Sequence, residues 1–296
     1  MKITITGGSG FIGLKLSKLF TDLGHEVLIL DIRPPRKEIK GVKFVEANLL
    51  KEPVPPEAIE CDAIVHLAGV NIFGRWTEDY KKLILESRTK TAKTLIDAIK
   101  ASEHTPEVFV SASAIGYYGD GGEEKLDESA PSGNDFLANV CKRWEAVAQT
   151  SEDAGMRWVS VRTGIVLGPG GGMLGKLVPI FKMFLGGPLA SGNQWFSWIH
   201  IEDLLNVYKK AVLDSNLSGP VNAVAPNPVR NKEFAKALGS AVNRPAIIPV
   251  PKFALKIVLG ELANEITMSQ RVIPKKIQET DFNYKYPDIN SALKNL

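Results

Sequence analysis

The chain has 296 residues, enough for one large domain or two of ordinary size, with a core that needs no disulfide or metal to hold it together. Hydrophobic residues make up 44% and charged residues 23% of the sequence, which is ordinary for an α/β protein. The net charge of +3 is small and no long basic run carries aromatic residues, so we expect no nucleic-acid partner.

The cysteines and the first residues bear on where the protein works. Cys61 and Cys141 have no metal-like spacing and lie in apolar surroundings, which predicts no metal site and a reduced, cytoplasmic protein. Met1 leads directly into an apolar strand, so we expect no signal peptide. No run of about 18 apolar residues is present, and we therefore expect no membrane partner.

Residues 2–13 are the most informative stretch of the chain. An alternating apolar strand runs into a turn with Gly7, Gly10 and Gly13 at three-residue intervals, and a helix follows. Glycine is needed where a Cβ would block the turn, the approach of a pyrophosphate or the packing of helix on strand. The N–H groups and positive dipole at the start of the helix favour a phosphate. The stretch therefore predicts a dinucleotide site.

The next residues supply the context that such a turn requires. The amphipathic helix ends at Gly24, a second strand covers residues 27–30, and Asp31 closes that strand, where a carboxylate can bond a ribose hydroxyl. Two later strands end near residues 48–49 and 67–69. The predicted cofactor-binding residues are Gly7, Gly10, Phe11, Ile12, Gly13, Asp31, Arg33, Asn48, Leu49, Leu67, Ala68 and Gly69.

Two signals oppose each other over the identity of the cofactor. Asp31 favours NAD, because its charge would repel a 2′-phosphate, and this local chemistry is our preference. Arg33 and Arg36 lie in the loop that follows, where they could bind the 2′-phosphate of NADP instead. We therefore keep both NAD and NADP.

Strand and helix patterns alternate through the first half of the chain. Apolar strands at residues 42–45, 63–67, 107–112 and 158–161 are separated by connections that include helical patterns at 78–101 and 134–154. This alternation predicts an α/β fold with a Rossmann-type, doubly wound parallel sheet.

The pattern changes at Arg162, and residues 164–175 are dense in glycine. We therefore predict a dinucleotide-binding domain at residues 1–163 and a smaller region at 164–296 that mainly binds substrate. Later strands at about 196–223 could join the first domain's sheet.

Several short stretches resemble one known family. The turn at residues 7–13, Ser87-Arg88 and the segments 113–119, 162–168 and 197–200 are similar to the extended short-chain dehydrogenase/reductases, the superfamily of the NAD-dependent epimerase/dehydratases. More narrowly, they look like an atypical subgroup called "epimerase family protein", whose members were once described as cell-division inhibitors. The tail from about Pro251 looks like the domain of unknown function that ends such proteins. The resemblance implies the same fold and pulls the cofactor prediction toward NADP.

The sequence departs from that superfamily at the catalytic residues. The resemblance implies a tyrosine that acts as general acid/base and a lysine four residues later that lowers its pKa. If Glu145 in the matching helix keeps the register of the glutamate that commonly follows this pair, Leu137 and Cys141 stand at these positions, and a shift of one residue does not restore both. Lys142 is one residue away, a rotation of about 100° along a helix, so it is expected to face solvent.

Other residues are candidates for the chemistry that remains. Ser113 matches the serine that orients a substrate oxygen in the superfamily, and Tyr117 and Tyr118 follow it in the same loop. Each tyrosine is either a replacement proton donor or an aromatic wall of the pocket. The candidate substrate-binding residues, each with an alternative structural role, are Arg75, Arg88, Arg162 and His200.

Two functions fit these residues. The first is an NAD(P)-binding, epimerase- or dehydratase-like oxidoreductase with an atypical active site, acting on a small carbonyl or hydroxyl compound such as a nucleotide sugar. The second is a regulator that senses the dinucleotide without turning it over. The sequence leaves a homodimer open.

Overall fold

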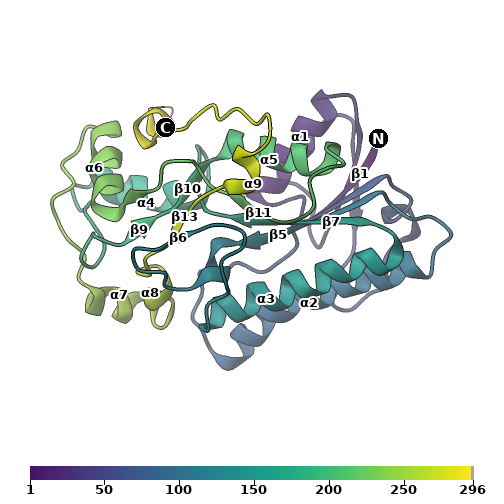
Figure 1. Ribbon diagram of the computed structural model, residues 1–296, viewed down its shortest axis with the longest axis horizontal. Helices are drawn as coiled ribbons and strands as arrows, with labels where there is room; N and C mark the ends of the chain where they lie inside the picture. The colour runs from purple at the N-terminus through teal and green to yellow at the C-terminus, as the bar shows by residue number, and fades with distance from the viewer. Residues whose placement is uncertain (295–296) are drawn as a thin grey trace.

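The computed structural model describes residues 1–294, and its centre is a seven-stranded sheet in the order β11-β7-β5-β4-β1-β2-β3 (Figure 1). All neighbouring strands run parallel. The strands are β1 (Lys2–Thr6), β2 (Glu26–Asp31), β3 (Val42–Glu46), β4 (Ala63–His66), β5 (Val108–Ala114), β7 (Arg157–Thr163) and β11 (Gly219–Ala223). The chain order reverses between β1 and β4, so the predicted doubly wound fold is confirmed.

Four helices cover the two faces of the sheet. Helices α1 (Phe11–Asp22) and α5 (Ile201–Leu213) lie on one face, and α2 (Glu78–Lys100) and α3 (Phe136–Gln149) lie on the other (Figure 1). Side-chain caps define three of their starts: Thr77 accepts a hydrogen bond from the Tyr80 N–H, Asp135 accepts one from the Ala138 N–H, and His200 accepts one from the Glu202 N–H. The predicted helix at 134–154 is divided, since its last turn is the 3₁₀ helix η3 (Thr150–Ala154).

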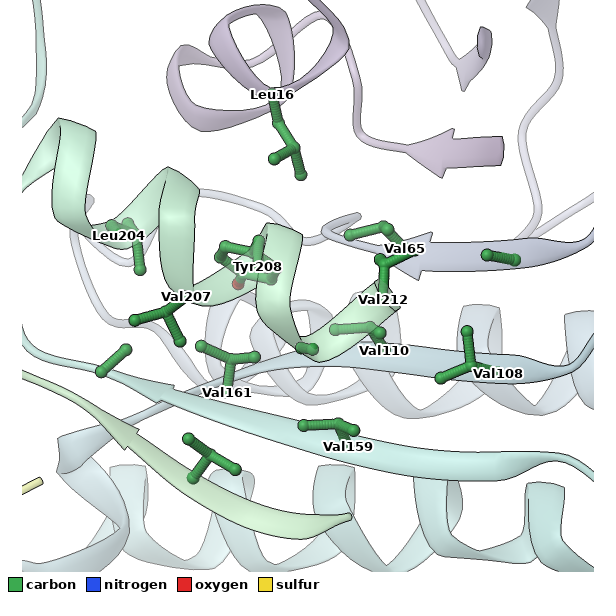
Figure 2. Packing of buried hydrophobic residues seen from close by; sticks show 14 of the residues in the cluster. Leu16, Val65, Val108, Val110, Val159, Val161, Leu204, Val207, Tyr208 and Val212 are labelled. Carbon is green, nitrogen blue, oxygen red and sulfur yellow. The ribbon is translucent and has the colours of Figure 1, made fainter. Parts of the chain in front are cut away.

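The core under α1 and α5 is a continuous apolar cluster. Figure 2 shows side chains of α5 directed at valines of β5 and β7, with Leu16 of α1 above them. Each such fully buried aliphatic side chain contributes about 1.5–3 kcal/mol to stability. The labelled members are Leu16, Val65, Val108, Val110, Val159, Val161, Leu204, Val207, Tyr208 and Val212.

The later part of the chain adds short elements beyond the carboxyl ends of the main strands. Three two-stranded pairs are β8–β10, β9–β12 and β6–β13. The strands are β6 (Lys125–Leu126), β8 (Ile165–Leu167), β9 (Trp195–Phe196), β10 (Trp198–His200), β12 (Val229–Arg230) and β13 (Arg271–Val272). The helices are α4 (Gly172–Lys182), α6 (Asn231–Ala241), α7 (Lys252–Leu259), α8 (Leu262–Glu265), α9 (Lys275–Gln278) and α10 (Ile289–Leu293). The first half of the chain also contains two 3₁₀ turns, η1 (Pro56–Ala58) before β4 and η2 (Ile115–Tyr118) after β5.

This later region has its own apolar core and shares strands with the first half. Phe181, Trp198 and Phe234 belong to a separate buried cluster, whereas β11 pairs with β7 at the edge of the main sheet. Within residues 1–294, no helix is long and apolar enough to cross a membrane.

Candidate functional site

The glycine turn has the geometry that close approach of a phosphate requires. Gly7 adopts a φ of +67°, and a Cβ there would lie 2.9 Å from the backbone of Ala68 at the end of β4. A Cβ on Gly13 would lie 2.6 Å from the Gly8 Cα, so the first turn of α1 packs on the glycine turn without room for a side chain. These contacts fit the residues to a bound dinucleotide, because a side chain would fill the space the backbone keeps open.

Asp31 lies against this turn. Its carboxylate accepts hydrogen bonds from the Ser9 N–H at 3.0 Å and from the Ile32 N–H at 2.7 Å. Arg33 and Arg36 are exposed in the loop that follows, and neither forms an ion pair with another described residue. The turn therefore lies beside a carboxylate that already accepts two hydrogen bonds. The loop that follows carries two guanidinium groups that form no ion pair with a described residue.

The ends of β3 and β4 form the neighbouring rim. Leu49 is buried, and Asn48 is half-buried beside it. Leu67, Ala68 and Gly69 continue β4, and the backbone of Leu67 and Ala68 lies next to Gly7.

The rim after β4 is fixed by α2. Arg88 donates one hydrogen bond to the Val70 carbonyl oxygen at 3.0 Å and another to the Ile84 carbonyl oxygen at 2.9 Å. The Ser87 hydroxyl accepts one from the Val70 N–H. Arg88 is a candidate for substrate contact. In the structure, its bonds hold the loop that follows β4 against α2.

His66 is buried in the sheet beneath this rim. Its Nδ1 lies 2.8 Å from the Thr6 hydroxyl, and Thr91 lies near its other nitrogen at 3.3 Å. Burial lowers the pKa of His66 to about 4, so the ring is neutral at physiological pH. Among the described residues, no group of three or more His, Cys, Asp or Glu side chains could hold a metal ion.

Phe11 and Ile12 open α1, and a second glycine-rich segment approaches them. A Cβ on Gly171 would lie 2.4 Å from the Phe11 ring, and one on Gly172 would lie 3.5 Å from it. The segment that leads into α4 thus packs on the first residue of α1. This brings the later region of the chain to the predicted phosphate site.

A buried polar network lies at the carboxyl ends of β5 and β7. Ser113 and Arg162 are paired in the register of these strands. The Ser113 hydroxyl donates to Glu145 at 2.6 Å, and Arg162 donates two hydrogen bonds to the same carboxylate, at 2.9 and 2.8 Å. Burial opposes the charge on Arg162, yet the bonds to Glu145 raise the pKa of its guanidinium above the ordinary value.

The two candidate tyrosines differ in their surroundings. The Tyr118 hydroxyl accepts a hydrogen bond from Arg162 at 2.9 Å and donates one to Asn222 at 2.7 Å. Burial raises the pKa of Tyr118 to about 12. Tyr117 is only half-buried, and the guanidinium carbon of Arg162 lies 3.5 Å from the centre of its ring. The Tyr118 hydroxyl is therefore hydrogen-bonded within the network, whereas Tyr117 contacts the network through the face of its ring.

Helix α3 presents Leu137 and Cys141 to this site. Both lie against Gly116, within 3.5 and 3.9 Å of the place a Cβ would take. Burial raises the pKa of the Cys141 thiol to about 12, so it is a neutral thiol. Lys142 is exposed, as expected from its position on the helix.

The other candidate substrate residues are not gathered there. His200 caps α5, where its Nδ1 accepts a hydrogen bond from the Glu202 N–H, and its ring packs on Tyr286 with centroids 3.8 Å apart. Burial lowers the pKa of His200. Arg75 is exposed in the loop before α2.

The sequence analysis did not assign several residues of the network. Glu145 was used only to fix the helix register, and Asn222, Glu128 and Gln270 were not singled out. The Asn222 N–H donates to Glu128 at 3.0 Å, and the Gln270 amide donates to the Ile115 and Gly119 carbonyl oxygens. Glu145 is the one member that the sequence could have indicated, because it lies on the same helix as the expected catalytic positions.

The fold and this site define a dinucleotide-binding protein of the doubly wound α/β class. Residues 3–223 match the model of the NAD dependent epimerase/dehydratase family, and residues 250–296 match a domain of unknown function, DUF1731. The chain belongs to the NAD dependent epimerase/dehydratase family. The resemblance predicted from the glycine turn and the later segments is thus confirmed, including the tail.

Similar proteins occur in distant organisms. The chain is 40% identical to the Arabidopsis thaliana "Epimerase family protein SDR39U1 homolog, chloroplastic", over 99% of this chain and 86% of that protein. It is 38% identical to the Bacillus subtilis epimerase family protein YfhF, over 100% and 98% of the two chains. A crystal structure of human epimerase family protein SDR39U1 with NADPH superposes with a TM-score of 0.89 at 36% identity, over 99% of this chain and 98% of that one.

Proposed function

We propose that the protein is an NADP(H)-dependent oxidoreductase or epimerase-like enzyme that acts on a small compound with a carbonyl or hydroxyl group, such as a nucleotide sugar. The observation that carries this proposal is the Arg162 guanidinium, buried and held by Glu145, against the ring of Tyr117. Arg162 places a positive charge beside a tyrosine. In the superfamily, the lysine of the Tyr-x-x-x-Lys pair supplies this charge.

Residues of the first half would hold the cofactor, and residues 164–296 would mainly hold the substrate. The glycine turn would bind the pyrophosphate, and Arg33 with Arg36 would bind a 2′-phosphate. Asp31 already accepts two backbone hydrogen bonds, so we expect the exposed Arg33 and Arg36 to determine whether NAD or NADP binds. The human relative bound to NADPH supports the same choice, against the NAD preference that Asp31 alone gives. When bound, the cofactor supplies or accepts hydride.

Tyr117 would move the proton at the substrate oxygen. Its hydroxyl can donate a proton to a substrate oxygen or accept one from it, and the Arg162 guanidinium over its ring places a positive charge beside it. Tyr118 suits this role less, because its hydroxyl is buried between Arg162 and Asn222. We therefore assign proton transfer to Tyr117 and the positioning of Arg162 to Tyr118 and Glu145.

Ser113 would orient the substrate. Its hydroxyl proton is donated to Glu145, so the oxygen would serve a substrate as a hydrogen-bond acceptor. This arrangement suits a substrate hydroxyl as donor. The hydrogen bond therefore supports an alcohol as the form of the substrate that Ser113 holds in the ground state.

A second function is favoured by one observation. Leu137 and Cys141, which we assign to the positions of the superfamily's tyrosine and lysine, lie against Gly116, and the thiol is neutral. A protein that binds NADP(H) without turning it over would keep the glycine turn and dispense with that pair. This dinucleotide-sensing regulator is the alternative to the enzyme.

One experiment separates the two functions. The full-length protein is loaded with NADPH and mixed with a panel of aldehydes, ketones and keto sugars, and loss of nicotinamide absorbance is followed. Nucleotide sugars are incubated in parallel and their products are analysed, because an epimerase regenerates its cofactor. Turnover in either arm supports the enzyme. Tight NADPH binding with no product in both arms would assign the sensor.

A further inference from the structure

One end of the molecule is covered by two neighbouring segments, residues 176–192 and 242–260. The Ile248 N–H donates to the Gly186 carbonyl oxygen at 3.2 Å, and the Val250 N–H donates to that of Pro188 at 2.9 Å. Helix α7 belongs to the second segment and lies at the opposite end of the molecule from the N-terminus (Figure 1). We call the exposed side chains of the two segments the basic apolar face.

This face concentrates the exposed apolar side chains of the protein. Of the fifteen large apolar side chains that are exposed between residues 1 and 294, nine belong to it. Monomeric proteins scatter such side chains singly, and a contiguous group marks an interaction site. The nine are Ile180, Met183, Phe184, Leu185, Ile247, Ile248, Phe253, Ile257 and Val258.

Helix α7 stands out from the body of the protein. Leu255 is its only buried side chain, whereas Phe253, Ile257 and Val258 are 68%, 81% and 79% exposed. Phe253 and Ile257 are four residues apart and so lie on one side of the helix. Because most of its apolar side chains are exposed, we expect α7 to bury them against another surface.

The charges of the face have one sign. Neither segment contains Asp or Glu, and together they carry Lys176, Lys182, Arg244, Lys252 and Lys256. The whole chain has 36 basic and 33 acidic residues, so this separation of charge is local. A second copy of the chain across a two-fold axis would bring these cations against their equivalents, which is unfavourable.

We propose that the basic apolar face binds peripherally to the surface of an anionic lipid bilayer, with α7 lying in the interface. Aromatic and aliphatic side chains would enter the headgroup boundary, and Lys252 and Lys256 would contact lipid phosphates. This binding requires no membrane-spanning helix. It revises the expectation that no membrane partner exists, and it is independent of the proposed enzymatic function.

The test is co-sedimentation of the full-length protein with vesicles of phosphatidylcholine alone or mixed with phosphatidylglycerol. We expect binding to the anionic vesicles that weakens as salt is added, and little binding to neutral ones. The variant Lys252→Gln with Lys256→Gln is expected to bind about fivefold more weakly for each lysine removed. The variant Phe253→Ser with Ile257→Ser should lose most of the binding.

Matched controls keep the test interpretable. Leu23→Ser with Leu213→Ser removes two exposed apolar side chains elsewhere and should bind vesicles as the parent does. Circular dichroism and thermal melting confirm that each variant is folded. Absence of binding to anionic vesicles at low salt would overturn the proposal. So would vesicle binding that survives both face variants, or a dimer in solution that only the Phe253→Ser/Ile257→Ser variant dissociates, which would assign the face to a second copy.

Discussion

The guanidinium carbon of Arg162 lies 3.5 Å from the centre of the Tyr117 ring, while the same group donates two hydrogen bonds to Glu145. Arg162 comes from β7, and Tyr117 comes from the turn that follows β5. Since the two strands pair in register, the cation and the ring meet at one edge of the sheet. This contact places a fixed positive charge beside a half-buried tyrosine.

The first prediction concerns proton transfer. Tyr117→Phe should lower kcat by about 10²–10⁴ with the Kd for NADPH unchanged, because only the hydroxyl is lost. Steady-state kinetics and fluorescence titration measure the two quantities. Tyr118→Phe is the matched variant, and it should reduce kcat less, since that hydroxyl acts through Arg162. An equal loss in both variants would contradict the assignment of Tyr117.

The second prediction concerns the buried ion pair. Arg162→Met should lower the free energy of unfolding by about 3–5 kcal/mol, because it leaves the Glu145 carboxylate buried without its partner. Urea denaturation measures the loss. The double variant Arg162→Met with Glu145→Leu should recover part of it, since no buried charge remains unpaired. A double variant no more stable than the single one would argue against this cause.

The third prediction concerns cofactor preference. Arg33→Ala with Arg36→Ala should raise the Kd for NADPH about tenfold or more and leave that for NADH nearly unchanged, because only NADPH carries a 2′-phosphate. Fluorescence titration of both cofactors gives the ratio. Lys18→Ala, which removes another exposed cation, is the control. Parallel losses for NADPH and NADH would contradict a 2′-phosphate site.

The fourth prediction concerns the glycine turn. Gly13→Ala should abolish measurable dinucleotide binding and lower the free energy of unfolding by about 1–3 kcal/mol, because its methyl group meets the Gly8 backbone. Gly175→Ala is the control: nothing lies within 4 Å of a Cβ there, and alanine in a helix should stabilise the protein by about 1 kcal/mol. Thermal melting and NADPH titration distinguish the two variants.

The fifth prediction concerns pH. The folded-state pKa of His66 is lowered to about 4 from 6.5, so protonation favours the unfolded chain. Stability should be unaffected by this group above pH 6.5 and fall by about 3 kcal/mol as pH drops from 6.5 to 4. Urea denaturation across that range measures the slope. His66→Asn should flatten it, whereas His104→Gln should keep it.

The sequence predicted the fold well because its signals are local. The glycine spacing at residues 7–13 and the alternation of apolar strands with amphipathic helices each depend on neighbours a few residues apart. The later strands expected at about 196–223 begin with two short strands, β9 and β10. Between them the Ser197 hydroxyl donates to the Gln270 carbonyl oxygen and accepts from the Val272 N–H. No local pattern predicts a contact across more than seventy residues.

The sequence was sufficient to predict the doubly wound fold and the family, and it led us to predict a dinucleotide-binding turn followed by Asp31. The surroundings of the remaining candidates depend on tertiary structure. The register of β5 with β7 sets Arg162 opposite Ser113, and α3 brings Glu145 to both. Side chains this far apart in the chain meet only when the sheet and its helices pack, so the placement of charge beside Tyr117 is a property of the fold.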